Sequence, residues 1–279
     1  MSTSVASGRL RVSAISYLNT VPLMYDFTHP PMREQLKERF DVHFTLPSVC
    51  AGELAEDTAD IGIIPVAAYT SVPELHIIPG VAIAAKHPVR SILLVSKKPL
   101  PEVRSVAADS SSRTSVALLK VLFERKFGGR PEYVAEAPEL ASMLARHDAA
   151  LLIGDPALRV DVGNSAYSCV DLAEEWQKMT GLPFVFAFWA VREDALRLAR
   201  DFDVNAVFQG SRDRGLANLE ELAAENAERY CVPGEVAQRY LSYHLDYALD
   251  PANLDGLRLF YRYAAECGAL AVGPELRLV

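Results

Sequence analysis

The chain has 279 residues, half of them apolar, which is enough to bury the cores of two α/β lobes. Its 28 basic and 36 acidic residues give a formal net charge of -8, and no block of Lys or Arg is present to bind a nucleic-acid backbone. We therefore expect a small-molecule partner and no nucleic acid. An anion site would need a local donor, such as a helix N-terminus or a placed Arg.

Several other functional classes lack their sequence signals. The four cysteines lie far apart and the six histidines have no metal-ligand spacing, so we expect neither a metal site nor a redox dithiol. There is no Gly-rich phosphate loop and no dinucleotide fingerprint, so no cofactor is expected. The first dozen residues do not resemble a signal peptide, and no apolar stretch is long enough to span a bilayer. We expect a cytoplasmic protein without a membrane partner.

The first part of the chain alternates between strands and helices. Residues 10–16 (LRVSAIS) predict a buried strand that leads into a polar loop. A helix near 32–39, a strand at 42–46, a helix at 49–56 and a strand at 61–64 follow. This alternation predicts a parallel sheet. Two more β-rich runs, at 77–85 and 91–95, complete the first predicted lobe.

A second lobe is predicted after the proline-containing link at 97–101. Strands at 105–108, 133–135 and 149–153 alternate with helices at 114–126 and 139–146. The apolar run at 184–191 suits a strand that returns the chain to the first lobe, and helices are expected at 195–208, 216–230, 233–247 and 253–267. We therefore predict an α/β fold with residues 1–97 and 188–279 in one lobe, 98–187 in the other, and a ligand cleft between them.

Hydroxyl groups gather where the predicted strand 105–108 leads into the next helix. Residues 109–115 read DSSSRTS. Free N–H groups at a helix start, flanked by hydroxyls, bind carboxylate or phosphate. The alternative is an ordinary N-cap, which needs a single hydroxyl. Because this segment has several, we favour an anion site, with binding candidates Ser111, Ser112, Arg113, Thr114 and Ser115.

Two other loops follow predicted strands at their carboxyl ends, the edge where open α/β sheets bind ligands. In the first loop, Ser16, Tyr17 and Asn19 can donate hydrogen bonds and supply an aromatic wall, although Asn19 could equally cap a turn. In the second loop, Gly154 permits close backbone approach to a ligand. Asp155 either caps the following helix, orients the lobe, or accepts a hydrogen bond from a hydroxyl group.

Several of these segments, in this order, resemble the chorismate dehydratase family of the futalosine route to menaquinone. They are SYLNTVP at 16–22, ADIGIIPV at 59–66, VRS at 89–91, the hydroxyl-rich 109–115 and LIGDPA at 152–157. The resemblance implies a type II periplasmic-binding-protein architecture. It also implies conversion of chorismate to 3-[(1-carboxyvinyl)oxy]benzoate by loss of water, without a cofactor.

The resemblance also assigns roles to two residues. Asn19 and Ser91 occupy the positions that are thought to be catalytic in this family. Asn19 would then orient or polarise the substrate, and Ser91 would hold it in the reactive pose or assist departure of the hydroxyl group. A candidate base is the substrate's own enolpyruvyl carboxylate, because removal of the ring hydrogen at C3 gives a delocalised enolate and loss of the C4 hydroxyl makes the ring aromatic.

Three alternatives stay open. A solute-binding protein would share the fold but should carry an export signal or a lipobox cysteine. The sister enzyme 1,4-dihydroxy-6-naphthoate synthase would share the architecture, but its first loop has a Cys-Pro-Asn element where this chain reads Tyr-Leu-Asn at 17–19. A ligand-sensing regulator would be expected to carry a DNA-binding helix-turn-helix segment.

Overall fold

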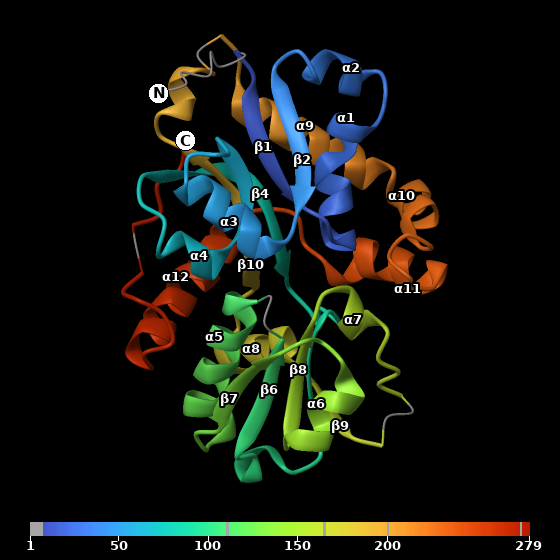
Figure 1. Ribbon diagram of the computed structural model, residues 1–279, viewed down its shortest axis with the longest axis vertical. Helices are drawn as coiled ribbons and strands as arrows, with labels where there is room; N and C mark the ends of the chain where they lie inside the picture. The colour runs from blue at the N-terminus through green and yellow to red at the C-terminus, as the bar shows by residue number, and fades with distance from the viewer. Residues whose placement is uncertain (1–7, 110–111, 164–165, 200, 274) are drawn as a thin grey trace.

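The computed structural model describes residues 8–109, 112–163, 166–199, 201–273 and 275–279, and it has two lobes, each built on a five-stranded sheet (Figure 1). The strand order in the first lobe is β2-β1-β3-β10-β4, and in the second lobe β7-β6-β8-β5-β9. The first sheet contains β1 (Leu10–Ile15), β2 (Phe40–Thr45), β3 (Ile61–Pro65), β4 (Leu75–Ala85) and β10 (Phe184–Arg192). The second contains β5 (Ile92–Ser96), β6 (Ser105–Asp109), β7 (Glu132–Glu136), β8 (Ala149–Ile153) and β9 (Ser168–Asp171).

Both sheets are mixed, whereas the sequence predicted a parallel sheet. β1 runs parallel to β2 and β3, and β6 runs parallel to β7 and β8. β10 is antiparallel to β3 and β4, and β5 is antiparallel to β8 and β9. The strands that run antiparallel to their neighbours, β5 and β10, each come after the chain has crossed from one lobe to the other. After β1, the remaining strands are each reached from the preceding strand within the same lobe.

The first passage between the lobes lies earlier than the predicted link at 97–101. The strand expected at 91–95 in the first lobe is β5, which pairs with β8 and β9 in the second sheet. The chain therefore crosses at residues 86–91 and returns at 181–183, just before β10. An apolar strand can have the same composition in either lobe, so composition alone could not assign this strand to the second sheet.

Helices cover the sheets and fill the first lobe. The N-terminal half contributes the 3-10 segment η1 (Leu18–Met24), α1 (Tyr25–Thr28), α2 (Met32–Leu36), α3 (Pro47–Ala55) and α4 (Val66–Tyr69). The second lobe adds the 3-10 turn η2 (Leu100–Glu102), α5 (Arg113–Leu122) with its π-helical end η3 (Phe123–Phe127), α6 (Leu140–Arg146), α7 (Asp155–Leu158) and α8 (Leu172–Thr180). The strand β9 and helix α8 occupy a stretch for which we made no prediction from the sequence.

The C-terminal helices differ from the predicted ones at both their starts and their ends. They are the 3-10 turn η4 (Ala195–Arg197), α9 (Val204–Ala217), α10 (Leu219–Asn226), α11 (Gly234–Arg239), the π-helical turn η5 (Tyr240–His244) and α12 (Pro251–Glu266). The helix predicted at 195–208 is a short turn followed by a new helix, because the side chain of Asp203 caps α9 by accepting from the Ala206 N–H at 3.1 Å.

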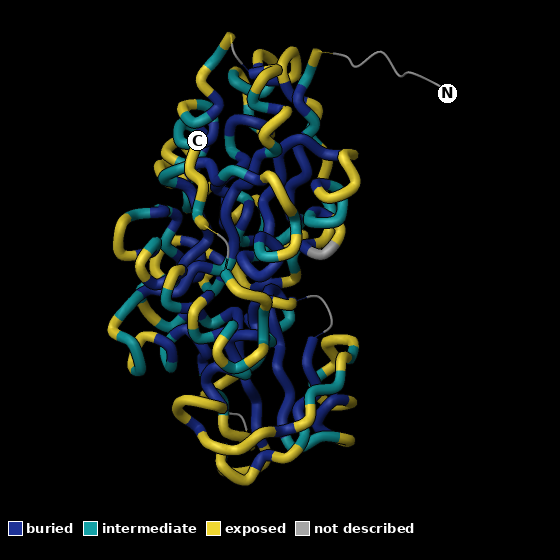
Figure 2. Tube along the Cα trace, turned by 90° about the vertical axis from the view of Figure 1, so that its left-hand side faces the viewer, coloured by how far each residue is buried: buried dark blue, intermediate teal, exposed yellow. Residues whose placement is uncertain are grey.

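Buried residues run along the strands of both lobes (Figure 2). An aromatic cluster joins the lobes. The indole of Trp176 on α8 packs edge-on against Phe184 of β10 and Phe260 of α12, with ring centroids 5.5 and 6.2 Å apart. α12 touches both β10 and α5, so it spans the two lobes on this side. None of the helices in the described part of the chain is long and apolar enough to cross a membrane.

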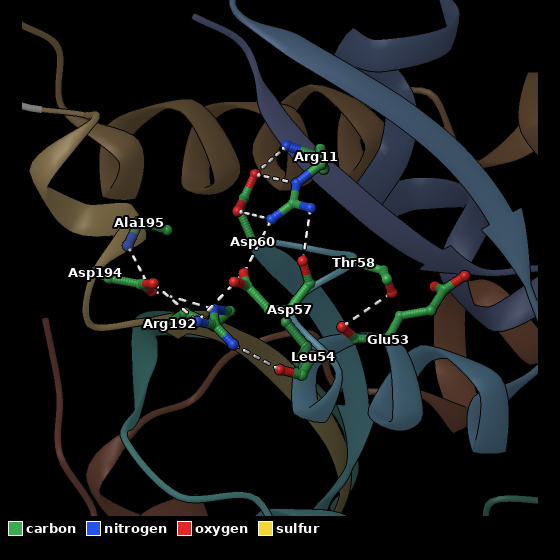
Figure 3. A network of polar contacts seen from close by, with 9 residues as sticks. All are labelled: Arg11, Glu53, Leu54, Asp57, Thr58, Asp60, Arg192, Asp194 and Ala195. Atoms are coloured by element: carbon green, nitrogen blue, oxygen red, sulfur yellow. Dashed lines mark hydrogen bonds and ion pairs between the residues drawn. The ribbon is translucent and has the colours of Figure 1, made fainter. Parts of the chain in front are cut away.

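An ion-pair network links strands of the first sheet at the end of the sheet that faces away from the second lobe (Figure 3). The carboxylate of Asp60 accepts from the backbone N–H of Arg11 at 2.7 Å and from its guanidinium at 2.6 and 3.0 Å. Asp57 joins Arg11 to Arg192 at the exposed rim. Three strands, β1, β3 and β10, are tied together here, because the Arg192 N–H also donates to the Asp60 carbonyl at 3.0 Å.

We predict that Asp60→Asn lowers the free energy of unfolding by about 2 kcal/mol, because an amide cannot accept from all three donors of Arg11 and carries no charge to attract its guanidinium. Asp57→Asn is the matched control and should cost less than about 1 kcal/mol, since its side chain is 61% exposed. Urea denaturation of both variants provides the measurement. Equal shifts of the two midpoints would show that the buried pair adds nothing.

Candidate active site

A cavity lies between the two lobes, with about 580 Å³ of empty space that partly opens to solvent. Its walls come from the carboxyl ends of β1 and β8, the start of β5, the start of α5 and the middle of β10. No charged side chain is among the described residues that line it. The lining residues are Ile15, Tyr17, Asn19, Pro47, Pro65, Ile83, Ser91, Ile92, Ser112, Thr114, Ser115, Ile153, Gly154, Phe186, Ala187 and Leu245.

The first-lobe wall is the segment that carries Tyr17 and Asn19, and helix α9 holds it in place. The Ser211 hydroxyl on α9 donates to the Leu23 carbonyl at 2.8 Å at the end of η1. The backbone of Gly215 passes so close to η1 that an added Cβ would lie 1.9 Å from the Pro22 carbonyl oxygen. A glycine is therefore required at position 215 to let α9 support the site loop.

The start of α5 forms the second-lobe wall, and its hydroxyls act partly as caps. Ser112 is the N-cap: its Oγ accepts from the Ser115 N–H at 3.1 Å and donates to the Ser115 Oγ at 2.9 Å. Thr114 reaches across to the first lobe, where its Oγ1 accepts from the Ala67 N–H at 3.1 Å. A hydroxyl has one proton and two lone pairs, so Thr114 and Ser115, which accept here, can still donate to a ligand.

Ser91 lies on the first passage between the lobes, immediately before β5. Its carbonyl accepts from the Gly154 N–H at 2.8 Å, which joins it to the end of β8. Its buried hydroxyl accepts from the hydroxyl of Tyr240 at 2.9 Å. The side chain of Asn19 also lies close enough to interact with the Tyr240 hydroxyl. The structure thus brings the two residues with predicted catalytic roles around one tyrosine.

Gly154 meets Tyr17 across the lobe boundary. Its backbone has φ 62° and ψ -144°, a conformation that only glycine adopts readily. An added Cβ would lie 3.5 Å from the Tyr17 ring, an ordinary contact distance. The backbone conformation, not lack of space, therefore requires glycine here.

Asp155 lies just outside the cavity lining, buried at the first position of α7. Burial raises the pKa of Asp155 to about 6, and a hydrogen bond from the Leu18 backbone and the charge of Arg159 oppose the rise. The bond to Leu18 joins the second lobe to η1 of the first lobe. The sequence suggested three roles for Asp155, as a helix cap, a lobe-orienting residue or a hydroxyl acceptor. In this geometry the carboxyl group contacts the first lobe, and Asp155 is not among the described residues that line the cavity.

The remaining predicted site residues lie elsewhere. The side chain of Ser16 contacts Tyr230. Arg113 is exposed and its guanidinium donates to the Ser71 hydroxyl at 3.4 Å, outside the cavity. Ser111 lies outside the described residues. Sequence reasoning missed Tyr240, because no local pattern marks one buried tyrosine among the predicted C-terminal helices.

Comparisons with known proteins agree on the family. A family model described as menaquinone biosynthesis matches residues 10–266. The chorismate dehydratase of Thermus thermophilus is 32% identical over 204 residues, covering 67% of this chain and 72% of that protein. The chorismate dehydratase of Campylobacter jejuni is 28% identical over 183 residues, covering 65% of this chain and 68% of that protein.

Solved structures support the fold. A structural-genomics protein from Archaeoglobus fulgidus superposes with a TM-score of 0.74 at 18% identity, covering 95% of this chain and 99% of that one. The periplasmic aliphatic sulphonate binding protein of Escherichia coli superposes with a TM-score of 0.68 at 16% identity, covering 96% and 94%. The two-lobed architecture is thus that of periplasmic binding proteins. Because the family model spans nearly the whole described chain, the protein belongs to the menaquinone biosynthesis family.

Proposed function

We propose that this protein is a chorismate dehydratase that converts chorismate to 3-[(1-carboxyvinyl)oxy]benzoate and water. The observation that carries the proposal is the meeting of Asn19, Ser91 and the hydroxyl-rich start of α5 around one interlobe cavity. The two curated relatives, both chorismate dehydratases, support it independently of this geometry. The proposal includes a reaction without metal or nucleotide and a cytoplasmic location.

The start of α5 would bind one carboxylate of the substrate. Thr114 and Ser115 offer hydroxyl protons there, and the positive end of the helix dipole favours an anion. Arg113, which is exposed, takes no part in this binding. The apolar part of the lining, including Ile83 and Phe186, would pack against the ring.

The reaction removes the ring hydrogen at C3 and the hydroxyl group at C4, which together leave as one water molecule. The proposed base is the enolpyruvyl carboxylate of the substrate itself, so the protein contributes orientation and hydrogen bonds. The Ser91 hydroxyl would donate to the departing hydroxyl group. The amide of Asn19, whose oxygen accepts from the Thr20 hydroxyl at 3.2 Å, would present its N–H groups toward the substrate and Tyr240.

Asn19→Ala and Ser91→Ala should each lower kcat on chorismate by about two to three orders of magnitude, because each removes a donor used in the transition state. The assay mixes purified protein with chorismate alone and follows formation of an aromatic acid lighter by one water, by absorbance and mass. Ser242→Ala, at an exposed serine that bonds only the Gln238 carbonyl among the described residues, is the matched control.

Two results would contradict the dehydratase assignment, and a third would contradict only the proposed roles of Asn19 and Ser91. Saturable binding of chorismate without turnover would favour a binding or sensing protein. Absence of both binding and turnover would favour the sister synthase, which acts on a larger substrate. Full activity in both alanine variants would remove Asn19 and Ser91 from the chemistry while leaving the dehydratase assignment intact.

Asp155 should make stability depend on pH. Because burial raises its pKa to about 6, the folded protein binds this proton more tightly than the unfolded chain does. Protonation of Asp155 therefore adds to the free energy of unfolding, relative to the ionised form. This contribution is fully present below about pH 4 and is lost as the pH rises through about 6. Asp155→Asn should stabilise the protein relative to the parent by on the order of 2 to 3 kcal/mol at pH 7 and by little at pH 4.

Thermal unfolding of parent and variant between pH 4 and pH 8 measures this difference. Asp255→Asn is the control, since the Asp255 side chain is 64% exposed and should show no such trend. A constant difference between Asp155→Asn and the parent across this range would mean that Asp155 titrates normally in the folded protein.

A further inference from the structure

Tyr240 occupies an unusual position beside the cavity. It is the first residue of η5, a π-helical turn that continues α11, and its side chain is 1% exposed. π-helical turns inside helices occur frequently at functional sites. A few residues on, the His244 ring contacts the Pro88 carbonyl at 2.6 Å, so the same turn is anchored to the first passage between the lobes.

The Tyr240 hydroxyl lies between the two residues with proposed catalytic roles. It donates to the Ser91 Oγ at 2.9 Å, and the side chain of Asn19 is its other polar partner. Burial holds the pKa of Tyr240 well above its ordinary value. The phenol therefore stays protonated and remains a donor at any pH at which the protein would work.

This donation fixes which way the Ser91 hydroxyl can point. The Ser91 backbone is already held, because its carbonyl accepts from Gly154 and the neighbouring residues Ile92 and Ile153 are paired in the sheet. The remaining freedom of Ser91 is rotation of its side-chain hydroxyl group. Once a lone pair of its oxygen is occupied by Tyr240, its single proton is directed away from Tyr240 and is available to a ligand in the cavity.

We propose that Tyr240 is a positioning residue that acts through Ser91, orienting the Ser91 proton toward the departing hydroxyl group of the substrate. This inference rests on the proposed dehydration of chorismate. It adds a residue that lies 149 positions from Ser91 in the sequence and is not among the described residues that line the cavity. A purely structural tyrosine would contribute to folding but would have no specific coupling to Ser91.

The test is a double-mutant cycle of Tyr240→Phe and Ser91→Ala. We expect Tyr240→Phe to lower kcat by about 10- to 100-fold with KM changed less than about three-fold, because the lost orientation matters in the transition state. In the Ser91→Ala background the same change should lower kcat by less than about three-fold, because only the contact with Asn19 is then left to lose. Replacement of Tyr240 by 3-fluorotyrosine keeps the hydroxyl and should keep kcat within about three-fold of the parent.

Tyr247→Phe is the matched control. Tyr247 is also buried, and its hydroxyl has no hydrogen-bond partner among the described residues, so its removal should leave kcat unchanged. Circular dichroism and thermal unfolding verify the fold of each variant.

The outcomes separate the two proposals. If the parent dehydrates chorismate and Tyr240→Phe retains full kcat, or loses activity additively with Ser91→Ala, the positioning role is wrong and the dehydratase stands. An equal loss in Tyr247→Phe would also overturn it, because the effect would then be one of packing. If Tyr240→Phe does not fold, a 3-fluorotyrosine variant that folds but loses kcat would count against the role. A parent that does not convert chorismate overturns both proposals.

Discussion

The site depends on hydrogen bonds that the protein donates to its own cavity hydroxyls. Ser91 accepts from Tyr240, and Thr114 accepts from the backbone N–H of Ala67 in the other lobe. The Ser115 hydroxyl likewise accepts a hydrogen bond from the hydroxyl of Ser112, the N-cap of the same helix. A hydroxyl whose lone pair is occupied is set to donate with its single proton. The described lining residues therefore offer neutral donors and no charged side chain, which is how the proposed site would hold an anion in a chain of net charge -8.

Neutral donors also suit the proposed chemistry better than a cation would. An Arg or Lys beside a carboxylate lowers its pKa and hence its strength as a base. If the enolpyruvyl carboxylate of the substrate takes the ring proton, a cationic pocket around it would oppose the reaction. Hydroxyls and an amide can orient the same group at a smaller loss of basicity, and formation of an aromatic ring supplies the driving force that a strong protein base would otherwise have to provide.

The sequence predicted the parts of this structure whose signal is local. The strand at 10–16 and the hydroxyl-rich start of α5 were found because apolar runs and capping residues leave short patterns. The membership of β5 in the second sheet was not found, because pairing partners leave no trace in one strand's composition. Tyr240 was missed for the same reason, since its role exists only where a distant turn meets Ser91. Arg113, chosen for its charge, faces Ser71 outside the cavity, because its direction depends on helical phase.

The polar groups of the site come from different parts of the fold, so the proposed reaction requires the two lobes to lie together. Asn19 and Tyr240 belong to the first lobe, Ser115 to the second, and Ser91 to the passage between them. The contact of the Tyr17 ring with the second lobe and the hydrogen bond from Leu18 to Asp155 join the lobes over the cavity. A binding protein needs such closure only to trap its ligand. In the proposed dehydratase the donors come from both lobes, so the full set would be assembled only where the lobes meet.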